Sequence, residues 1–278
     1  MSSIDRYAVI GHGVGHSRSP QIHGLFAQST GQSMQYGLID VPAADFAAAA
    51  RDFFAGGGRG LNVTVPHKEA ARSLAERLTP RARRAGAVNT LALGAESDAR
   101  ALLGDNTDGA GLVRDLTVNL GYALTGTRVL LLGAGGAARG VIAPLLQGGV
   151  GELMIHNRTP ARAQQLAREF ADLGAKAFGD GADGGGYDLI INATSASLRG
   201  ELPSVPQAAC DTRTICYDLA YGSSETVFVR WARAAGAAGA IMGLGMLVEQ
   251  AAESFLLWRG VRPDTAPVLA ILRQGTAG

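Results

Sequence analysis

Hydrophobic positions along the first part of the chain alternate between two spacings. Short apolar runs with the composition of β-strands are each followed by a segment with helical spacing. The strand–helix pairs are residues 7–11 with a helix from about Pro20, residues 34–40 with 44–54, and residues 61–65 with 67–78. Strands that alternate with helices are typical of βαβ units, so the pattern predicts an α/β fold with helices on the faces of a parallel sheet.

The same alternation starts again after Asp105, which indicates a second domain. The last long segment, residues 246–260, has apolar positions at helical spacing on more than one face. We therefore expect a largely buried helix there that returns to the first domain. The prediction is one domain of residues 1–105 plus 246–278 and a second domain of residues 106–245.

Composition and charge narrow the classes of function. The 25 Lys and Arg residues nearly balance the 24 Asp and Glu residues, so the net charge of +1 gives no electrostatic reason to expect a nucleic acid or a membrane as partner. No secretory signal and no long apolar span is evident, so we expect a cytoplasmic protein. Two cysteines and five scattered histidines lack metal-ligand spacing, so no metal is expected. The 39 glycines suggest close approaches of the backbone to a small-molecule ligand.

A glycine-rich turn predicts a dinucleotide site in the second domain. The apolar strand Val129–Leu132 runs directly into residues 133–138, GAGGAA, and then into a helical pattern. This matches G-x-G-x-x-A at a strand-to-helix turn. Gly133 would permit the tight turn, Gly135 would let the backbone approach a pyrophosphate, and the helix N-terminus would bind it. The alternative is a glycine turn with a purely structural role.

The end of the next strand predicts which dinucleotide binds. An NAD site has an acidic residue there, whereas this chain has Asn157, Arg158, Thr159 and Pro160. A guanidinium binds the 2′-phosphate of NADP, and Arg162 lies one helical turn from Arg158. The sequence therefore predicts NADP rather than NAD, with a solvated basic helix start as the alternative.

The first domain carries candidate catalytic residues. Asn62 and Thr64 alternate with apolar residues, so both side chains should point to one face of a strand or to its end. Lys68 falls in the first turn of the next helix, and Asp108 opens another helix at the domain junction. Such a pair could share a proton with a substrate hydroxyl while a hydride leaves its carbon. The alternatives are a surface lysine paired with Glu69 and an aspartate that only caps its helix.

Three further polar residues suit a small hydroxylated acid. Asn89 follows a short apolar segment and could donate a hydrogen bond to a substrate hydroxyl. Ser17 and Ser19 lie at a helix start, where hydroxyls and backbone N–H groups suit a carboxylate. The alternative for the serines is that they only cap the helix.

Together these segments resemble the shikimate dehydrogenase family over nearly the whole chain. The motifs that carry the resemblance are, in order, GHSRSPQIH, GLNVTVPHK, AGAVNT, GDNTDGAG, GAGGAAR, NRTPAR, NATS, YDLAYG and GLGMLVEQA. The resemblance implies an N-terminal α/β substrate domain and a Rossmann-type NADP-binding domain. It further implies reversible reduction of 3-dehydroshikimate to shikimate with NADPH, in aromatic amino-acid biosynthesis. It leaves open whether the protein forms a homodimer.

The resemblance also implies a role for each matching residue. Lys68 and Asp108 would be the catalytic pair and would contact the substrate. The other substrate-binding residues would be Ser17, Ser19 and Tyr221 at the carboxylate, and Asn62, Thr64, Asn89 and Gln250 at the ring hydroxyls. The NADP-binding residues would be Gly133, Ala134, Gly135, Gly136, Ala137, Asn157, Arg158, Thr159, Arg162, Thr194 and Gly243.

The chain departs from the family pattern without losing a proposed catalytic group. The family has Asn-Pro where this chain has His12-Gly13, and Asn where it has Gly24. Further departures are Ser223, Thr226-Val227 and Met242. Two alternatives stay open: a dehydrogenase of the same family that prefers quinate, for which the altered loop at residues 12–13 could give room, and a non-enzymatic NADP-sensing protein.

Overall fold

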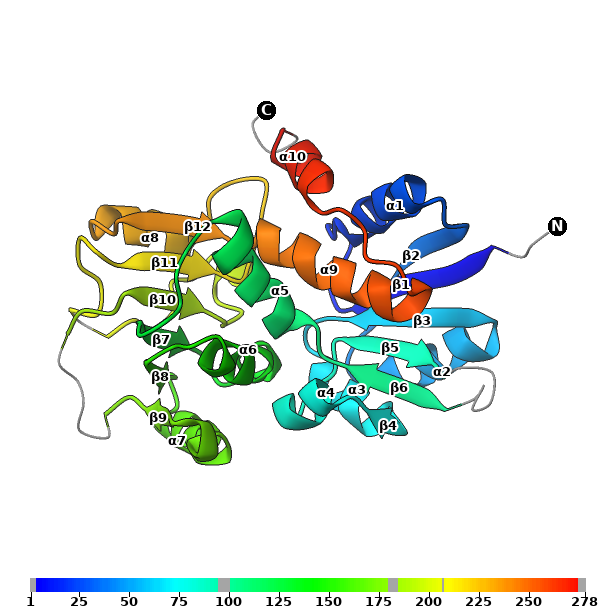
Figure 1. Cartoon of the computed structure of the whole chain (residues 1–278). Helices are drawn as coiled ribbons and strands as arrows, with labels where there is room; N and C mark the ends of the chain where they lie inside the picture. Colours follow the sequence, from blue (N-terminus) through cyan, green and yellow to red (C-terminus); the bar gives the residue numbers. More distant parts are fainter. Residues whose placement is uncertain (1–3, 95–100, 180–184, 207, 275–278) are drawn as a thin grey trace. The chain divides into compact units, whose positions relative to one another are not determined.

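The chain divides into two compact units of similar size. The structure, a computed structural model, describes residues 4–94, 101–179, 185–206 and 208–274. One unit comprises residues 1–111 with 247–272, and the other comprises residues 112–246 with 273–278 (Figure 1). The boundaries between the two units fall inside helices. One of these helices begins at Asp108, and its first turn packs in the first unit, because a Cβ on Gly111 would lie only 2.6 Å from the backbone nitrogen of Gln250.

The first unit is built on a mixed six-stranded sheet with the order β2-β1-β3-β5-β6-β4. Its strands are β1 (Asp5–Gly11), β2 (Met34–Asp40), β3 (Gly58–Val63), β4 (Arg77–Leu78), β5 (Thr90–Leu93) and β6 (Leu102–Asp105). The prediction of a parallel sheet is correct for β1, β2 and β3. It is wrong for β5, which runs antiparallel to both β3 and β6. Only residues 94–101 separate the end of β5 from the start of β6, whereas a parallel pair needs a connection of about a dozen residues or more.

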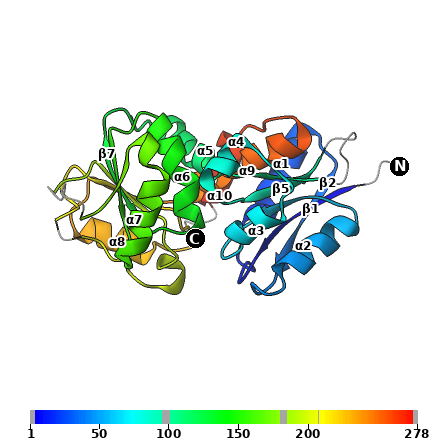
Figure 2. The same cartoon turned by 90° about the horizontal axis from the view of Figure 1, so that it is seen from below.

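Helices cover both faces of this sheet. They are α1 (Ser19–Thr30), α2 (Phe46–Ala55), α3 (Lys68–Leu74), α4 (Pro80–Ala85), α9 (Leu244–Arg259) and α10 (Ala266–Gln274). Figure 2 shows α1 and α9 on one face and α2 and α3 on the other. The helix expected over residues 67–78 ends at Leu74, because the chain becomes extended at Ala75 and forms β4. The expected return of the C-terminal helix to the first sheet is confirmed: Trp258 donates a hydrogen bond of 3.1 Å to the carbonyl of Leu91.

The alternation of side chains along β3 separates an apolar face from a polar one. Leu61 and Val63 are buried in a hydrophobic cluster that includes Phe46 and Ala50 of α2. Asn62 points to the opposite face, where it donates a hydrogen bond to Ser254 of α9. This is the two-residue period of a strand, and it places the polar side chains of the sheet beneath α9.

The second unit is a fully parallel six-stranded sheet with the order β12-β11-β10-β7-β8-β9. Its strands are β7 (Arg128–Leu132), β8 (Glu152–His156), β9 (Ala175–Ala177), β10 (Leu189–Asn192), β11 (Ile215–Asp218) and β12 (Gly239–Met242). Its helices include α6 (Gly136–Gln147), α7 (Pro160–Glu169) and α8 (Val227–Ala234), and α5 (Asp108–Arg114) leads into the unit. Residues Val129–Leu132 of the central strand are completely buried, as expected for a parallel strand covered on both faces. The predicted α/β fold is confirmed.

A buried carboxylate fixes the end of β6, from which the chain continues to Asp108. Asp105 is almost completely buried and accepts hydrogen bonds from the Arg81 guanidinium at 2.6 and 2.8 Å and from the Thr79 hydroxyl at 2.6 Å. Burial alone would raise the pKa of Asp105, but the hydrogen bonds and the charge of Arg81 hold it below the ordinary value of 3.8. The ion pair therefore stabilises the fold when Asp105 is ionised.

Replacing Arg81 by Met should leave the buried carboxylate of Asp105 with its hydrogen bond from Thr79 but without a positively charged partner. We expect the free energy of unfolding, measured by urea denaturation at pH 7, to fall by about 3 kcal/mol. Because the pKa of Asp105 is lowered in the native protein, its contribution is present above the ordinary value of 3.8 and is lost as the pH falls. The difference in free energy of unfolding between the unchanged protein and the Arg81→Met variant should therefore become smaller toward pH 3. Arg83→Met, on the same helix but exposed, is the matched control. A difference that stays constant down to pH 3 would contradict this account.

Candidate active site

Lys68 and Asp108 meet at the starts of two helices of the first unit. The Nζ of Lys68 lies 2.5 Å from Oδ2 of Asp108, and the side chains are only 13% and 5% exposed. Helix α3 begins at Lys68 and α5 begins at Asp108. The structure thus brings together an amine and a carboxylate from separate segments, whereas Glu69 is exposed beside them.

Asn89 holds the other oxygen of the Asp108 carboxylate. Its amide nitrogen donates hydrogen bonds of 2.8 Å to Oδ1 of Asp108 and to the hydroxyl of Thr107. Its amide oxygen accepts from the backbone N–H of Thr107 at 2.8 Å and from the hydroxyl of Thr90 at 2.9 Å. With both ends of the amide engaged, Asn89 cannot rotate without breaking these bonds. The orientation of the carboxylate toward Lys68 is therefore set by Asn89.

A second row of buried polar groups lies next to Asn89. The amide nitrogen of Asn62 donates to the hydroxyl of Ser254 at 2.8 Å and to that of Thr90 at 3.3 Å. The two hydroxyls are 2.8 Å apart and both residues are completely buried. Gln250, one turn before Ser254 on α9, brings its Oε1 to 3.4 Å from the amide nitrogen of Asn89. Asn62, Asn89 and Gln250 therefore belong to one hydrogen-bonded group with Asp108.

The sequence reasoning missed the residues that join this group, namely Thr90, Thr107 and Ser254. Thr90 directly follows Asn89, and Thr107 directly precedes Asp108. Ser254 lies four residues after Gln250, on the same face of a helix. Their positions in the sequence could have identified these three residues. A hydroxyl that is next to a candidate site residue in the chain, or one helical turn from it, can be buried beside that residue.

His23 is completely buried and contacts Asn62 of this hydrogen-bonded group. The amide oxygen of Asn62 accepts from the hydroxyl of Tyr36 at 2.7 Å and lies 3.2 Å from Nε2 of His23. Burial lowers the pKa of His23 to about 3, although the contact with Asn62 opposes this, so the ring is neutral at pH 7. Since the amide oxygen can only accept, Nε2 carries the proton. The His23 ring also stacks on Tyr36 with ring centres 4.2 Å apart.

Ser17 and Ser19, the residues expected at a carboxylate, lie just before and at the start of α1. The Oγ of Ser17 accepts a hydrogen bond of 3.2 Å from the backbone N–H of Ser19, which is the first residue of α1. Ser17 is half-buried and Ser19 is buried. Thr64, half-buried just after β3, is fixed by a backbone hydrogen bond of 3.0 Å to Ile10. Tyr221, by contrast, belongs to the second unit and is half-buried after β11.

The glycine-rich turn of the second unit has a backbone conformation that favours glycine at Gly133. Gly133 has φ +112°, and a Cβ there would lie 3.2 Å from the backbone of Ala193 and from the side chain of Thr194. Gly135 precedes the first residue of α6, and a Cβ on it would meet nothing within 4 Å. Its backbone is therefore open to a ligand, next to the unbonded N–H groups of the first turn of α6. Ala134, Gly136 and Ala137 are half-buried around this turn, and Gly135 is exposed.

The segment after β8 presents two arginines. Arg158 and Arg162 are both exposed, on either side of Pro160, with which α7 begins. The side chain of Asn157 donates a hydrogen bond of 3.0 Å to the carbonyl of Thr159. Thr159 occupies the position before α7, but its hydroxyl does not cap the helix.

Two further expected cofactor residues lie at strand ends of the same sheet. Thr194, after β10, donates a hydrogen bond of 2.7 Å from its hydroxyl to Asn192. Gly243 follows β12, where a Cβ would lie 2.6 Å from the carbonyl oxygen of Leu219, so only glycine fits. These placements keep both residues at the carboxyl ends of parallel strands, where α/β folds bind ligands.

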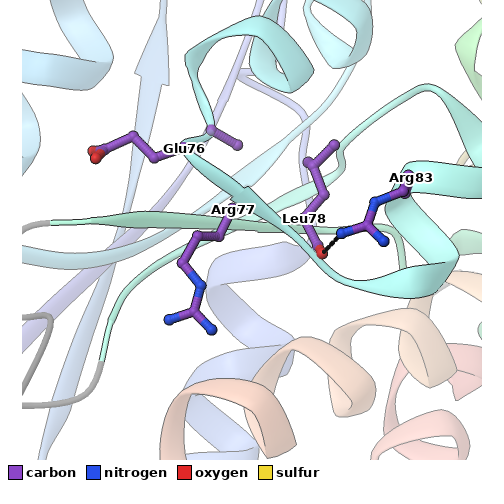
Figure 3. Close-up of a pocket in the computed structure, with 5 residues that line it drawn as sticks. Glu76, Arg77, Leu78 and Arg83 are labelled. Carbon is purple, nitrogen blue, oxygen red and sulfur yellow. Dashed lines mark hydrogen bonds between the residues drawn. The ribbon is translucent and has the colours of Figure 1, made fainter.

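A cavity of about 400 Å³ lies elsewhere in the first unit. Its walls are Ala75, Glu76, Arg77, Leu78 and Arg83. Figure 3 shows Arg83 donating to the carbonyl of Leu78, with Glu76 and Arg77 pointing in different directions. The cavity shares no lining residue with the hydrogen-bonded group around Asp108. Within the described residues there is also no cluster of three potential metal ligands, and no helix is sufficiently long and apolar to cross a membrane.

Replacing Thr90 by Val should show what its hydroxyl contributes. Valine has nearly the same shape as threonine but lacks the hydroxyl, so the buried amides of Asn62 and Asn89 each lose one hydrogen-bond partner. We expect the free energy of unfolding to fall by about 1–3 kcal/mol, measured by urea denaturation. Thr90→Ser keeps the hydroxyl and should recover most of this loss. A Val variant as stable as the unchanged protein would contradict the assignment.

Three family profiles match consecutive parts of the chain. They are described as shikimate dehydrogenase substrate binding domain, over residues 9–91, shikimate / quinate 5-dehydrogenase, over residues 116–205, and shikimate 5'-dehydrogenase C-terminal domain, over residues 243–273. A curated relative from Alkalilimnicola ehrlichii, named shikimate dehydrogenase (NADP(+)), is 58% identical over 270 residues, which cover 97% of this chain and 98% of the relative.

Solved structures agree with these matches. An Ael1 enzyme from Pseudomonas putida is 45% identical with a TM-score of 0.86, covering 96% of this chain and 98% of its own. The shikimate 5-dehydrogenase of Thermus thermophilus, solved in complex with NADP(H) and shikimate, is 34% identical with a TM-score of 0.83, covering 98% of this chain and 99% of its own. The resemblance inferred from the nine motifs is confirmed, and the chain belongs to the shikimate dehydrogenase family.

Proposed function

We propose that this protein is an NADP-dependent shikimate dehydrogenase, which interconverts 3-dehydroshikimate and shikimate in aromatic amino-acid biosynthesis. The observation that carries the proposal is the buried contact of 2.5 Å between Lys68 and Asp108, with Asn89 on the second carboxylate oxygen. The relative from Alkalilimnicola ehrlichii, 58% identical, bears the name of this activity. On this proposal residues 1–105 with 246–278 bind the substrate, and residues 106–245 bind NADP.

The substrate would be held by its carboxylate and its ring hydroxyls. Ser17 and Ser19, together with Tyr221, are proposed to bind the carboxylate. Asn62, Thr64, Asn89 and Gln250 are proposed to bind the hydroxyls. The amide of Asn62 already has four protein neighbours, so a substrate hydroxyl must replace one of them or share it.

The Lys68–Asp108 pair would move the proton of the reacting hydroxyl. NADPH, when bound, supplies the hydride that reduces the substrate carbonyl. As negative charge develops on that oxygen, the ammonium of Lys68 donates a hydrogen bond to it and then transfers the proton. Asp108, fixed by Asn89, keeps the amine oriented, and the pair accepts the proton when shikimate is oxidised.

The second unit fits NADP in two places. The turn of Gly133, Ala134, Gly135, Gly136 and Ala137 is proposed to hold the pyrophosphate, because the space beside Gly135 is open. Asn157, Arg158, Thr159 and Arg162 are proposed to bind the 2′-phosphate and its ribose. Thr194 and Gly243 would line the remaining part of the cofactor.

Two alternatives make different predictions about turnover. A quinate-preferring enzyme would oxidise quinate faster than shikimate at equal concentration. An NADP-sensing protein would bind the cofactor without turnover, and it gives no reason for Lys68, Asp108 and Gln250 to occur together. We place the enzyme in the cytoplasm, and light scattering will decide between a monomer and a homodimer.

Lys68→Met should abolish most of the turnover. We expect kcat for shikimate oxidation to fall by about 100- to 10,000-fold while NADP binding is unchanged, because only proton transfer loses its group. The assay follows absorbance of the reduced nicotinamide. Lys176→Met removes the chain's other lysine and should leave kcat unaltered. Unchanged turnover in the Lys68 variant would remove this residue from the mechanism.

Arg158→Ala should weaken NADP binding and leave NAD binding almost unchanged. The loss of a charged hydrogen-bond donor to the 2′-phosphate corresponds to about 1.5–3 kcal/mol. Titration of each cofactor against the variant measures this directly. Arg168→Ala, in the last turn of α7, is the control. Equal losses for both cofactors would refute the assignment.

A further inference from the structure

The turn between β1 and α1 is bound by a carboxylate from the end of β2. Oδ1 of Asp40 accepts the backbone N–H of Gly13 at 2.9 Å, and Oδ2 accepts that of Val14 at 3.1 Å. The Nδ1 of His12 lies 3.5 Å from Oδ1. These hydrogen bonds, led by that from Gly13, hold the pKa of Asp40 below its ordinary value, so the group is ionised at pH 7.

The hydrogen bond from the N–H of residue 13 to Asp40 depends on glycine at this position. Its φ is +72°, a conformation that glycine adopts without strain and that proline cannot adopt. Proline also lacks the N–H that Asp40 accepts here. The turn at His12-Gly13 is therefore not loose, because the carboxylate of Asp40 accepts hydrogen bonds from the N–H groups of Gly13 and Val14.

A continuous series of hydrogen bonds connects Asp40 to both serines. The carbonyl of Val14, whose N–H is held by Asp40, accepts the N–H of Ser17 at 2.9 Å. The Oγ of Ser17 in turn accepts the N–H of Ser19 at 3.2 Å. Each step fixes the backbone that carries the next, so the position of the serine hydroxyls depends on the turn that Asp40 holds.

The same turn also contacts the end of β3. The N–H of His12 donates to the carbonyl of Val65 at 3.1 Å. A Cβ on Gly11 would lie 2.4 Å from the side chain of Val14 and 2.5 Å from that of Thr64, so these two side chains pack directly over Gly11. Movement of the turn would therefore disturb the surroundings of Thr64 as well as the serines.

We propose that Asp40 is a positioning residue for the substrate carboxylate, acting through Gly13 and Val14 to place Ser17 and Ser19. The inference rests on the proposed function of the two serines. Asp40 itself carries the same charge as the substrate carboxylate and would not bind it. Its contribution is to hold the donors, so its removal weakens binding without changing the proton-transfer groups.

The test compares Asp40→Ala and Asp40→Asn with the unchanged enzyme, using shikimate and its methyl ester as substrates. We expect the KM for shikimate to rise about ten-fold in the Ala variant and less in the Asn variant, whose amide oxygen can still accept one N–H. The value of kcat should stay within about two-fold, because the interaction acts equally in the ground state and the transition state. The KM for the ester, which lacks the charged carboxylate, should change little.

Asp45→Asn, an exposed aspartate before α2, is the matched control and should leave both KM values unchanged. An unaltered KM for shikimate in both Asp40 variants would overturn the proposal, as would an equal rise for the acid and the ester. If the unchanged protein does not oxidise shikimate with NADP, the proposed function itself fails, and this result is distinct from the other two.

Discussion

The buried contact between the Lys68 ammonium and the Asp108 carboxylate is the constraint on which the first unit's site depends. Removing two charges from water is costly unless each is paired and hydrogen-bonded. The structure meets this requirement with one carboxylate oxygen on Lys68 and the other on Asn89. Since α3 and α5 begin at Lys68 and Asp108, the starting points of two helices are coupled to the same pair.

The polar layer beneath α9 explains how such a pair can persist inside a small domain. Amides and hydroxyls from β3, β5 and α9 bond to each other and leave the apolar side chains of β3 on the opposite face. A buried amide has a fixed orientation only when both of its ends have partners. Asn62 and Asn89 both satisfy this condition, so the layer acts as a rigid support. In the second unit, the glycine-rich turn follows the end of β7 and the two arginines follow the end of β8.

The sequence predicted those features that depend on local pattern. The strand-to-helix turn at Gly133 and the helix that opens at Asp108 follow from local spacing and glycine, and the structure has them. The helix expected from residue 67 begins one residue later, at Lys68. The direction of β5 was not predictable, because a short apolar run carries no information about its neighbours in the sheet. The short strand β4 was mistaken for the end of a helix because residues 75–78 continue the helical spacing of the preceding segment.

Contacts between distant segments account for what the sequence did not reveal in the site. Ser254 and Thr90 are 164 residues apart, and only the packing of α9 on β5 brings their hydroxyls together. Asp40 and Gly13 are likewise joined only by the pairing of β1 with β2. The glycine at position 13, taken alone, indicates a looser loop, whereas the fold supplies a carboxylate that orders it.

A crystal structure of the protein with NADP and shikimate bound tests the central claim most directly. The account predicts that the Nζ of Lys68 and a carboxylate oxygen of Asp108 both lie within about 3.2 Å of the hydroxyl that is oxidised. It also predicts that Asn89 still donates to the Asp108 carboxylate in the complex. A reacting hydroxyl out of reach of both groups, with a different side chain in contact with it, would contradict the account.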